Sequence, residues 1–256
     1  MNFPDEATQF GDLAPHYDEL MDVVPYNAWV DYIELLLSLY SHEPQRVLDC
    51  ACGTGNVSFE MALRGWHIVG VDISVPMIEV AQQKVRETLI ASDLTFYADD
   101  LTTFDLGEKF DTVTCLYDSL NYILEPEKLQ AAFEHIRAHT EDYGLFIFDM
   151  NSDWAFEADL FTQRNMDARR DLNYDWTANY DADSRICNVQ MTFRRKDENG
   201  ATENFYETHR ERAYTLSEVK TLLANSGWKL LRSFDAYTLN PPHKNSERWY
   251  FVARPA

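Results

Sequence analysis

The chain has 256 residues, a formal net charge of −21 and a hydrophobic content of 45%. This composition is typical of a soluble globular enzyme and argues against disorder. Nucleic-acid binding rests on neutralising phosphates, so an acidic chain with no basic stripe is not expected to bind DNA or RNA. The four cysteines make no disulfide framework. With neither a signal-peptide pattern nor an apolar run near the roughly 20 residues that span a bilayer, we expect a cytoplasmic protein without membrane attachment.

The first 150 residues alternate between helix and strand patterns. Residues 1–40 form an N-terminal segment whose second part, 28–40, has the apolar spacing of a helix. Apolar strands are expected at 46–50, 66–72, 94–99, 110–117 and 144–150, with helices at 55–64, 74–88 and 126–140. Such alternation predicts a parallel sheet covered by helices on both faces, which is a doubly wound α/β fold.

After residue 150 the apolar period changes to two. Aromatic or apolar residues alternate with polar ones over 172–180, 187–194 and 202–212, with turns at 181–184 and 197–200. This pattern predicts a three-stranded antiparallel meander, inserted over 151–212, with one half-buried aromatic face. A capping box at Thr215 and Glu218 then opens a helix, and strands at 228–236 and 248–255 complete the main sheet. We therefore expect a single domain over 1–256.

The stretch "VLDCACGTGNVS" (47–58) places a glycine-rich loop directly after the first strand. A phosphate-binding loop would need Lys and then Ser or Thr after the last glycine, where this chain has Asn-Val. A dinucleotide fingerprint would need a third glycine where Ser58 stands. A zinc site would need more ligands than Cys50 and Cys52, which we interpret as small buried side chains. No metal is therefore expected at this loop.

Three acidic residues follow the first three strands and indicate the ligand. Asp49 suits a cationic amine, Asp72 suits two ribose hydroxyls, and Asp100 suits the exocyclic amine of adenine. Asp99 could take the place of Asp100, because the two are neighbours. An amine, a ribose and an adenine with no phosphate between them describe S-adenosylmethionine.

At these residues the chain resembles the class I S-adenosylmethionine-dependent methyltransferases. Residues 47–58 are similar to their glycine-rich motif, with Ala51 in place of its first glycine; 69–84 are similar to their second motif, and 97–123 to their third and fourth. The resemblance covers 47–149 in order and at the right spacing. It implies a Rossmann-like, seven-stranded sheet of order 3-2-1-4-5-7-6, with the last strand antiparallel.

The resemblance also implies roles for single residues. Gly53 and Gly55 would let the backbone approach the methionine part, Met77 would pack near the adenine, and Asp100 with the Leu101 backbone would bind its edge. The residues expected to bind the cofactor are Tyr17, Trp29, Asp49, Ala51, Cys52, Gly53, Gly55, Asp72, Ile73, Met77, Asp99, Asp100, Leu101 and Leu116.

The N-terminal stretch "LAPHYDELMD" (13–22) resembles the segment that lids the cofactor in small-molecule methyltransferases. Methyl transfer relies mainly on alignment, and a base can take the proton of an amine or hydroxyl acceptor. The candidates are Tyr17, His16, Asp118, His209 and His243, of which we expect Tyr17 and His209 to be catalytic. The stretch "NPPH" (240–243) lies between the last two strands, so we interpret it as a turn.

The sequence thus predicts transfer of a methyl group from S-adenosylmethionine to a nitrogen or oxygen of a small-molecule acceptor. The inserted meander is similar in architecture to that of aminosugar and glycine N-methyltransferases, which leaves the acceptor atom open. Two alternatives remain open: a non-catalytic regulator that binds S-adenosylmethionine, and a nicotinamide-dependent oxidoreductase, which Ser58 and Asp49 disfavour. A homodimer is compatible with the sequence.

Overall fold

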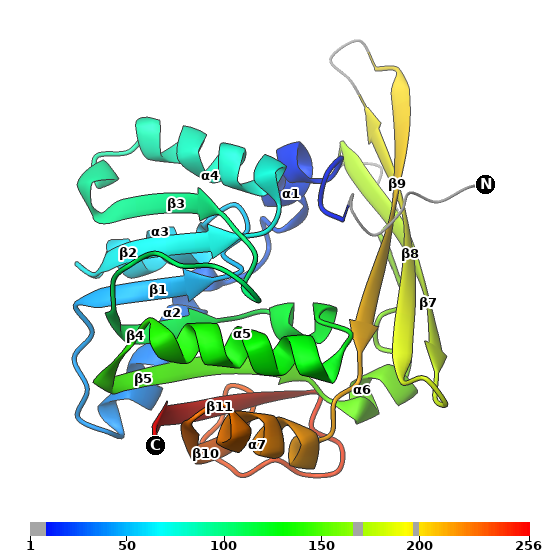
Figure 1. Cartoon of the computed structure of the whole chain (residues 1–256). Coiled ribbons are helices and arrows are strands. Elements are labelled where there is room, and N and C mark those ends of the chain that lie inside the picture. The colour runs from blue at the N-terminus through cyan, green and yellow to red at the C-terminus, as the bar shows by residue number, and fades with distance from the viewer. Residues whose placement is uncertain (1–8, 166–170, 197–199) are drawn as a thin grey trace.

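The computed structural model has a seven-stranded sheet with helices on both faces and a separate four-stranded sheet. It describes residues 9–165, 171–196 and 200–256. In Figure 1 the second sheet stands beside the edge at which the parallel strands β1 to β3 end, and the short helix α1 lies between the two sheets. None of the described helices is both long and apolar enough to cross a lipid bilayer.

The main sheet has the predicted topology. Its strands are β1 (Arg46–Cys50), β2 (His67–Asp72), β3 (Leu94–Ala98), β4 (Phe110–Cys115), β5 (Thr140–Asn151), β10 (Trp228–Asp235) and β11 (Arg248–Pro255). They lie in the order β3-β2-β1-β4-β5-β11-β10, and β11 pairs antiparallel with both of its neighbours. Counted within this sheet, the order is 3-2-1-4-5-7-6, so the expected fold is confirmed.

Helices cover both faces of this sheet, as the alternating pattern predicts. The longer ones are α2 (Tyr26–Ser38), α3 (Asn56–Ala62), α4 (Val75–Arg86), α5 (Pro126–Ala138) and α7 (Leu216–Asn225). The buried residues of α5 and α7 share one apolar core, and those of α2, α3 and α4 share the core on the other face. The capping box of Thr215 and Glu218 is present, and the Ser74 hydroxyl accepts from the Met77 N–H at the start of α4.

The second sheet is antiparallel and has one strand more than predicted. Its order is β6 (Gln163–Asn165), β7 (Leu172–Asp181), β8 (Ile186–Lys196) and β9 (Thr202–Arg212). The three long strands are confirmed. β6 was not predicted, because its three residues are all polar and show no alternation. Residues 166–170 of the expected insertion, and 197–199 of the turn expected at 197–200, lie outside the described residues.

The N-terminal segment packs between the two sheets. Its short elements are η2 (Ala14–His16) and α1 (Tyr17–Leu20), and residues 1–8 lie outside the described part. Leu13 is buried in an apolar cluster with residues of β7 and β8, and Phe10, Tyr17 and Leu20 pack against that cluster. The remaining short elements are η3 (Ala91–Asp93), η4 (Ser119–Tyr122) and α6 (Asp153–Glu157). The N-terminal segment therefore closes the space beyond the carboxyl ends of the main strands.

Candidate functional site

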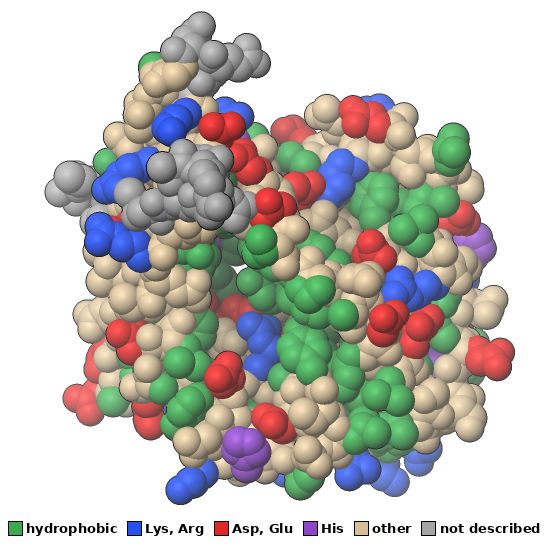
Figure 2. Space-filling view, turned by 180° about the vertical axis from the view of Figure 1, so that it is seen from behind, with side chains coloured by type: hydrophobic (Ala, Val, Ile, Leu, Met, Phe, Trp, Pro, Cys, Tyr) green, Lys and Arg blue, Asp and Glu red, His purple; other side chains and the backbone are tan. Residues whose placement is uncertain are grey.

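A cavity of about 840 Å³ lies between the main sheet, the N-terminal segment and the second sheet. Figure 2 shows the molecule hollowed between the second sheet and the main body, with hydrophobic side chains gathered along the hollow. Every residue expected to bind the cofactor lines this cavity, except Gly55 and Asp99. Ligand pockets of a few hundred to a thousand Å³ are typical of enzymes, and this one has room for a nucleoside and a second small molecule.

The glycine-rich loop needs left-handed backbone at three positions. Ala51, Gly53 and Gly55 have φ values of +54°, +56° and +81°. Gly55 is also packed closely, because a Cβ at this position would lie 2.7 Å from Cζ of Phe96. Gly55 is the N-cap of α3 and does not line the cavity, so the structure gives it a part in shaping the loop, and its expected contact with the cofactor stays a prediction. Ala51 holds a conformation that costs an L-residue about 1–2 kcal/mol.

Asp49, at the carboxyl end of β1, is a buried acid in the cavity wall. Its carboxylate accepts hydrogen bonds from the Ser58 hydroxyl (2.5 Å) and the Thr114 hydroxyl (2.9 Å). Burial raises the pKa of Asp49 to about 6. Ser58, the residue that breaks the dinucleotide fingerprint, thus has a structural function here: its hydroxyl orients Asp49. An ionised, hydrogen-bonded carboxylate at this position can bind an ammonium group.

Asp72 and Asp100 follow the neighbouring strands and line the same cavity. The Asp72 carboxylate accepts from the N–H groups of Gly53 and Ser74, both at 2.8 Å, and therefore fixes the glycine loop to the end of β2. Burial raises the pKa of Asp72, although these two hydrogen bonds oppose the shift. Asp100 reaches the cavity, whereas Asp99 does not and instead accepts from the Asp100 N–H. Of the two neighbours, Asp100 is placed to meet a ligand.

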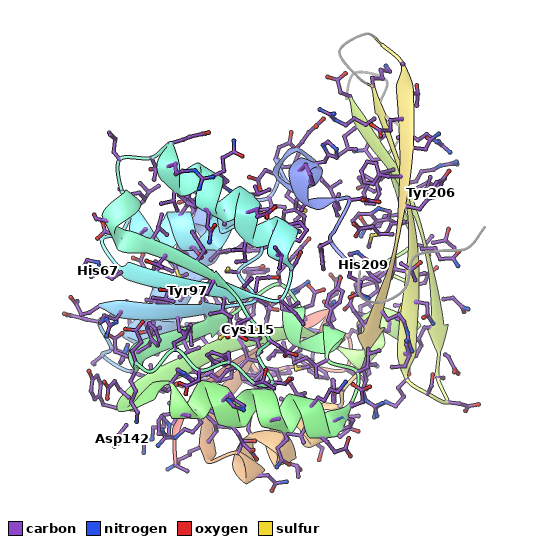
Figure 3. All side chains as sticks on the ribbon, turned by 45° about the horizontal axis from the view of Figure 1, so that its top comes forward. His67, Tyr97, Cys115, Asp142, Tyr206 and His209 are labelled. Carbon is purple, nitrogen blue, oxygen red and sulfur yellow. The ribbon has the colours of Figure 1, made fainter. Side chains whose placement is uncertain are left out.

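The histidine candidates differ clearly in position. His209 is 1% exposed, lines the cavity and projects from β9 toward the main body (Figure 3). His16 lies against Phe205, with ring centroids 5.5 Å apart, and the His243 side chain is 57% exposed. Neither His16 nor His243 lines the cavity. Tyr17 does, and burial raises the pKa of its hydroxyl well above the ordinary value, as it does for Tyr122, so neither hydroxyl is ionised near neutral pH.

Two residues that sequence reasoning missed make His209 part of a chain of hydrogen bonds. The Tyr122 hydroxyl lies 2.9 Å from Nδ1 of His209, and Nε2 of His209 lies 2.6 Å from Oε2 of Glu207. All three residues line the cavity. Glu207 and His209 are two apart on β9 and share one face of the strand. The strand's period of two contained that signal, but nothing in the sequence pointed to Tyr122 as the partner.

A second polar group surrounds the end of β4. Tyr117 and Asp118 both have left-handed backbone, with φ values of +64° and +55°. The Asp149 carboxylate accepts from their N–H groups at 3.1 and 2.6 Å, and Arg248 binds both Asp149 (3.0 Å) and Asp118 (2.7 Å). Strained backbone of this kind persists where the surrounding structure enforces it, which is often at functional sites.

The cavity is acidic at this end. Asp118 and Glu211 line it together with Arg248. Burial, followed by the nearby charge of Asp118, raises the pKa of Glu211 well above its ordinary value. Among the described residues no three His, Cys, Asp or Glu side chains are grouped as metal ligands would be. Asp118 is ion-paired with Arg248, and the Asn151 side-chain amide donates to Glu211, so these acids belong to one hydrogen-bonded group at this end of the cavity.

Comparison with known proteins identifies the family. Residues 47–144 match a family described as a methyltransferase domain. The chain is 33% identical over 240 residues to the putative methyltransferase YqeM of Bacillus subtilis, covering 93% of this chain and 94% of that protein. Over 150 residues, covering 56% of this chain and 55% of the relative, it is 27% identical to a dTDP-3-amino-3,6-dideoxy-alpha-D-glucopyranose N,N-dimethyltransferase of Streptomyces fradiae.

A solved structure agrees with these relatives. The crystal structure of an S-adenosylmethionine-dependent methyltransferase of Clostridium acetobutylicum superposes with a TM-score of 0.83 at 26% identity, covering 97% of this chain and 99% of the other. The matches give no support to a nicotinamide-dependent oxidoreductase. The chain therefore belongs to the class I S-adenosylmethionine-dependent methyltransferases, enzymes that use S-adenosylmethionine as methyl donor.

Proposed function

We propose that this enzyme transfers the methyl group of S-adenosylmethionine to an amine nitrogen of a small polar acceptor. One observation carries the proposal. A single cavity joins the residues expected to bind the cofactor, at the ends of β1, β2 and β3, to the Tyr122–His209–Glu207 chain and to the acids Asp118 and Glu211. The residues expected to bind the cofactor and a proton acceptor thus line the same cavity.

In this proposal the three strand-end acids hold the cofactor. Asp49 binds the ammonium of the methionine part, Asp72 the ribose hydroxyls, and Asp100 the adenine edge. All three line the cavity, and the sulfonium of the bound cofactor supplies an electrophilic methyl carbon. The chain's own contribution is to fix both reactants and to exclude water, because alignment supplies much of the rate in such a reaction.

The acidic end of the cavity supports an amine as acceptor. Amines are cations near neutral pH, and the carboxyl oxygens of Asp118 and Glu211 can accept hydrogen bonds from an ammonium group. Among the described residues, Arg248 is the one Lys or Arg side chain that lines the cavity. Trp176 and Tyr206 also line the cavity, and aromatic faces favour a cation. The related Streptomyces fradiae enzyme is by its name an N,N-dimethyltransferase of an amino sugar, which is consistent with nitrogen as the acceptor atom.

An ammonium must lose a proton before its nitrogen can attack, and the hydrogen-bond chain provides a route. If Nε2–H of His209 donates to Glu207, Nδ1 has the free lone pair and accepts from the Tyr122 hydroxyl. The Tyr122 oxygen can then take the acceptor's proton while its own proton passes to Nδ1. His209 becomes imidazolium, stabilised by the Glu207 carboxylate. Bases of this kind contribute about 10²–10⁴-fold to rate.

Matched acceptor pairs test the proposal. Amino sugars and amino acids would be compared with the hydroxy compounds of the same skeleton, with release of S-adenosylhomocysteine as the readout. We expect turnover of the amino member only, and a fall in kcat of about 10²-fold or more in Tyr122→Phe. Tyr143→Phe is the matched control, because Tyr143 is 71% exposed and does not line the cavity. Preference for the hydroxy compounds, or full activity of Tyr122→Phe, would contradict the proposal.

A further inference from the structure

Glu207 joins two parts of the chain that are far apart in sequence. It is 1% exposed, and its carboxylate accepts three hydrogen bonds. Oε1 accepts from the Leu13 N–H (2.9 Å), while Oε2 accepts from the Phe10 N–H (2.9 Å) and contacts Nε2 of His209 (2.6 Å). One buried carboxylate therefore holds both the histidine and the N-terminal strap, which we define as residues 9–13.

The strap also covers the histidine directly. The Phe10 ring lies 4.4 Å from the His209 ring and 5.7 Å from the Tyr122 ring, measured between centroids. Phe10 has a φ of +59°, a left-handed conformation that an L-residue holds only when its surroundings enforce it. Its N–H bond to Glu207 is one such constraint. All five strap residues line the cavity, so the strap forms part of the wall over His209.

We infer that Glu207 is a positioning residue. It fixes the direction of the Tyr122–His209 hydrogen bond, and it does this while the strap is hydrogen-bonded to the same carboxylate. The inference rests on the proposed function, since it concerns the base of that reaction. A carboxylate only accepts hydrogen bonds, so His209 must present Nε2–H to it and keep its lone pair on Nδ1. Nδ1 can then accept from Tyr122, which leaves the Tyr122 oxygen able to take a proton from the acceptor.

Without this carboxylate the direction can reverse. An amide in place of Glu207 can donate to Nε2, which moves the imidazole proton to Nδ1. Nδ1–H then donates to the Tyr122 oxygen, and the Tyr122 hydroxyl proton points into the cavity. In this arrangement the Tyr122 hydroxyl cannot pass its proton to His209, so it cannot take a proton from the acceptor. If the strap leaves, Glu207 loses two backbone donors and His209 loses its aromatic cover, so water enters. Base function and closure of the cavity are thus linked through one side chain.

Glu207→Gln tests the inference with two readouts that need no acceptor. Nitrogen-15 spectra of histidine-labelled protein, assigned with His209→Gln, report which ring nitrogen of His209 carries the proton. Hydrogen exchange reports the protection of the Phe10 and Leu13 amides. We expect the wild type to have the proton on Nε2, and Glu207→Gln to shift it toward Nδ1 and to exchange faster at the strap. Glu203→Gln, the same change at an exposed position of β9, should alter neither.

Kinetics supply a third readout once an acceptor is turned over. Replacing a carboxylate that orients a histidine by its amide lowers kcat by up to about 10⁴-fold where the geometry survives. We expect Glu207→Gln to lower kcat by about 10²-fold or more, with the dissociation constant of S-adenosylhomocysteine unchanged. A loss confined to KM would overturn the inference, because the histidine would then still act as a base.

A second variant covers the case in which Glu207→Gln does not fold. Glu207→Asp keeps the charge but is one methylene shorter, so it cannot reach the strap and His209 together. We expect the Nε2–H form to persist, with faster exchange at the strap and a lower kcat. If Glu207→Asp has the kcat of the wild type although its strap amides exchange faster, the link between base function and the strap is overturned. If Glu207→Gln folds and the His209 tautomer is unchanged, the inference itself is overturned. If the wild type has the Nε2–H form but does not methylate amines, only the proposed function is overturned.

Discussion

Asp49→Asn should make the protein more stable and a poorer binder of its cofactor. Asp49 is 3% exposed, and burial raises its pKa from 3.8 to about 6. The folded state therefore prefers the protonated acid, and keeping Asp49 ionised at neutral pH lowers the free energy of unfolding. At 1.36 kcal/mol per pH unit the penalty is about 3 kcal/mol. An amide of the same shape avoids it, and its oxygen can still accept from Ser58 or Thr114.

The direction in which the stability changes with pH follows from proton linkage. Between pH 3.8 and about 6 the folded protein binds more protons at Asp49 than the unfolded chain, so wild-type stability falls as the pH rises through this window. The stability advantage of Asp49→Asn should be full above about pH 7 and should disappear below about pH 4. At pH 7.5 a gain of 1–3 kcal/mol corresponds to a rise in Tm of about 2–6 °C.

Urea unfolding at several pH values measures this difference, and S-adenosylmethionine provides a second test. Loss of the ammonium contact should weaken binding by about 1.5–3 kcal/mol. A ligand at 100 times its Kd stabilises the wild type by about 2.7 kcal/mol, so the variant's advantage should nearly vanish when the cofactor is added.

Asp111→Asn is the matched control for the pH argument. Burial alone would raise the pKa of Asp111, but the His42 side chain 3.8 Å away and the hydrogen bond from the Arg46 N–H lower it, so the ionised form is the stabilising one. This variant should be less stable than the wild type at neutral pH. A stability difference for Asp49→Asn that does not change between pH 7.5 and pH 4, or an unchanged Kd for the cofactor, would refute the reasoning.

Three further predictions concern the cofactor and the lid. Asp72→Ala should weaken S-adenosylmethionine binding by about 1.5–3 kcal/mol, because a hydrogen bond to a charged group is lost; an unchanged calorimetric Kd would remove Asp72 from the site. Hydrogen exchange over 10–28 should slow when S-adenosylhomocysteine binds, more than over 185–195, and equal exchange with and without ligand would contradict a lid. Tyr17→Phe should lower kcat more than it raises the cofactor Kd, whereas full activity would reduce Tyr17 to packing.

The main sheet could be predicted because its signals are local. Apolar strands alternate with helices, and Asp49, Asp72 and Asp100 each follow a strand directly, so parallel strands bring them to one edge. The same reasoning found the three long strands of the second sheet from their period of two. It could not find β6, whose three polar residues are a strand only because β7 lies beside them.

The acceptor end could not be predicted in detail because its contacts join distant residues. Tyr122 and His209 are 87 positions apart, and Asp118 and Arg248 are 130 apart. Strand periodicity gives the face of a residue but not the element that packs against it. His209 was therefore one candidate among several histidines until its burial and its two hydrogen-bond partners were known. Gly55 and Asp99 were expected at the site from their places in the motifs, but neither lines the cavity: Gly55 packs against Phe96, and Asp99 accepts from the Asp100 N–H.

The destination of the methyl group tests the account most directly. S-adenosylmethionine carrying a carbon-13 methyl group would be incubated with the enzyme and an amine-bearing acceptor, and the product followed by correlated proton and carbon-13 spectra. The account predicts a labelled N-methyl signal that appears together with S-adenosylhomocysteine and is lost in Tyr122→Phe. A label found on oxygen or carbon, or an N-methyl product formed equally well by Tyr122→Phe, would contradict it.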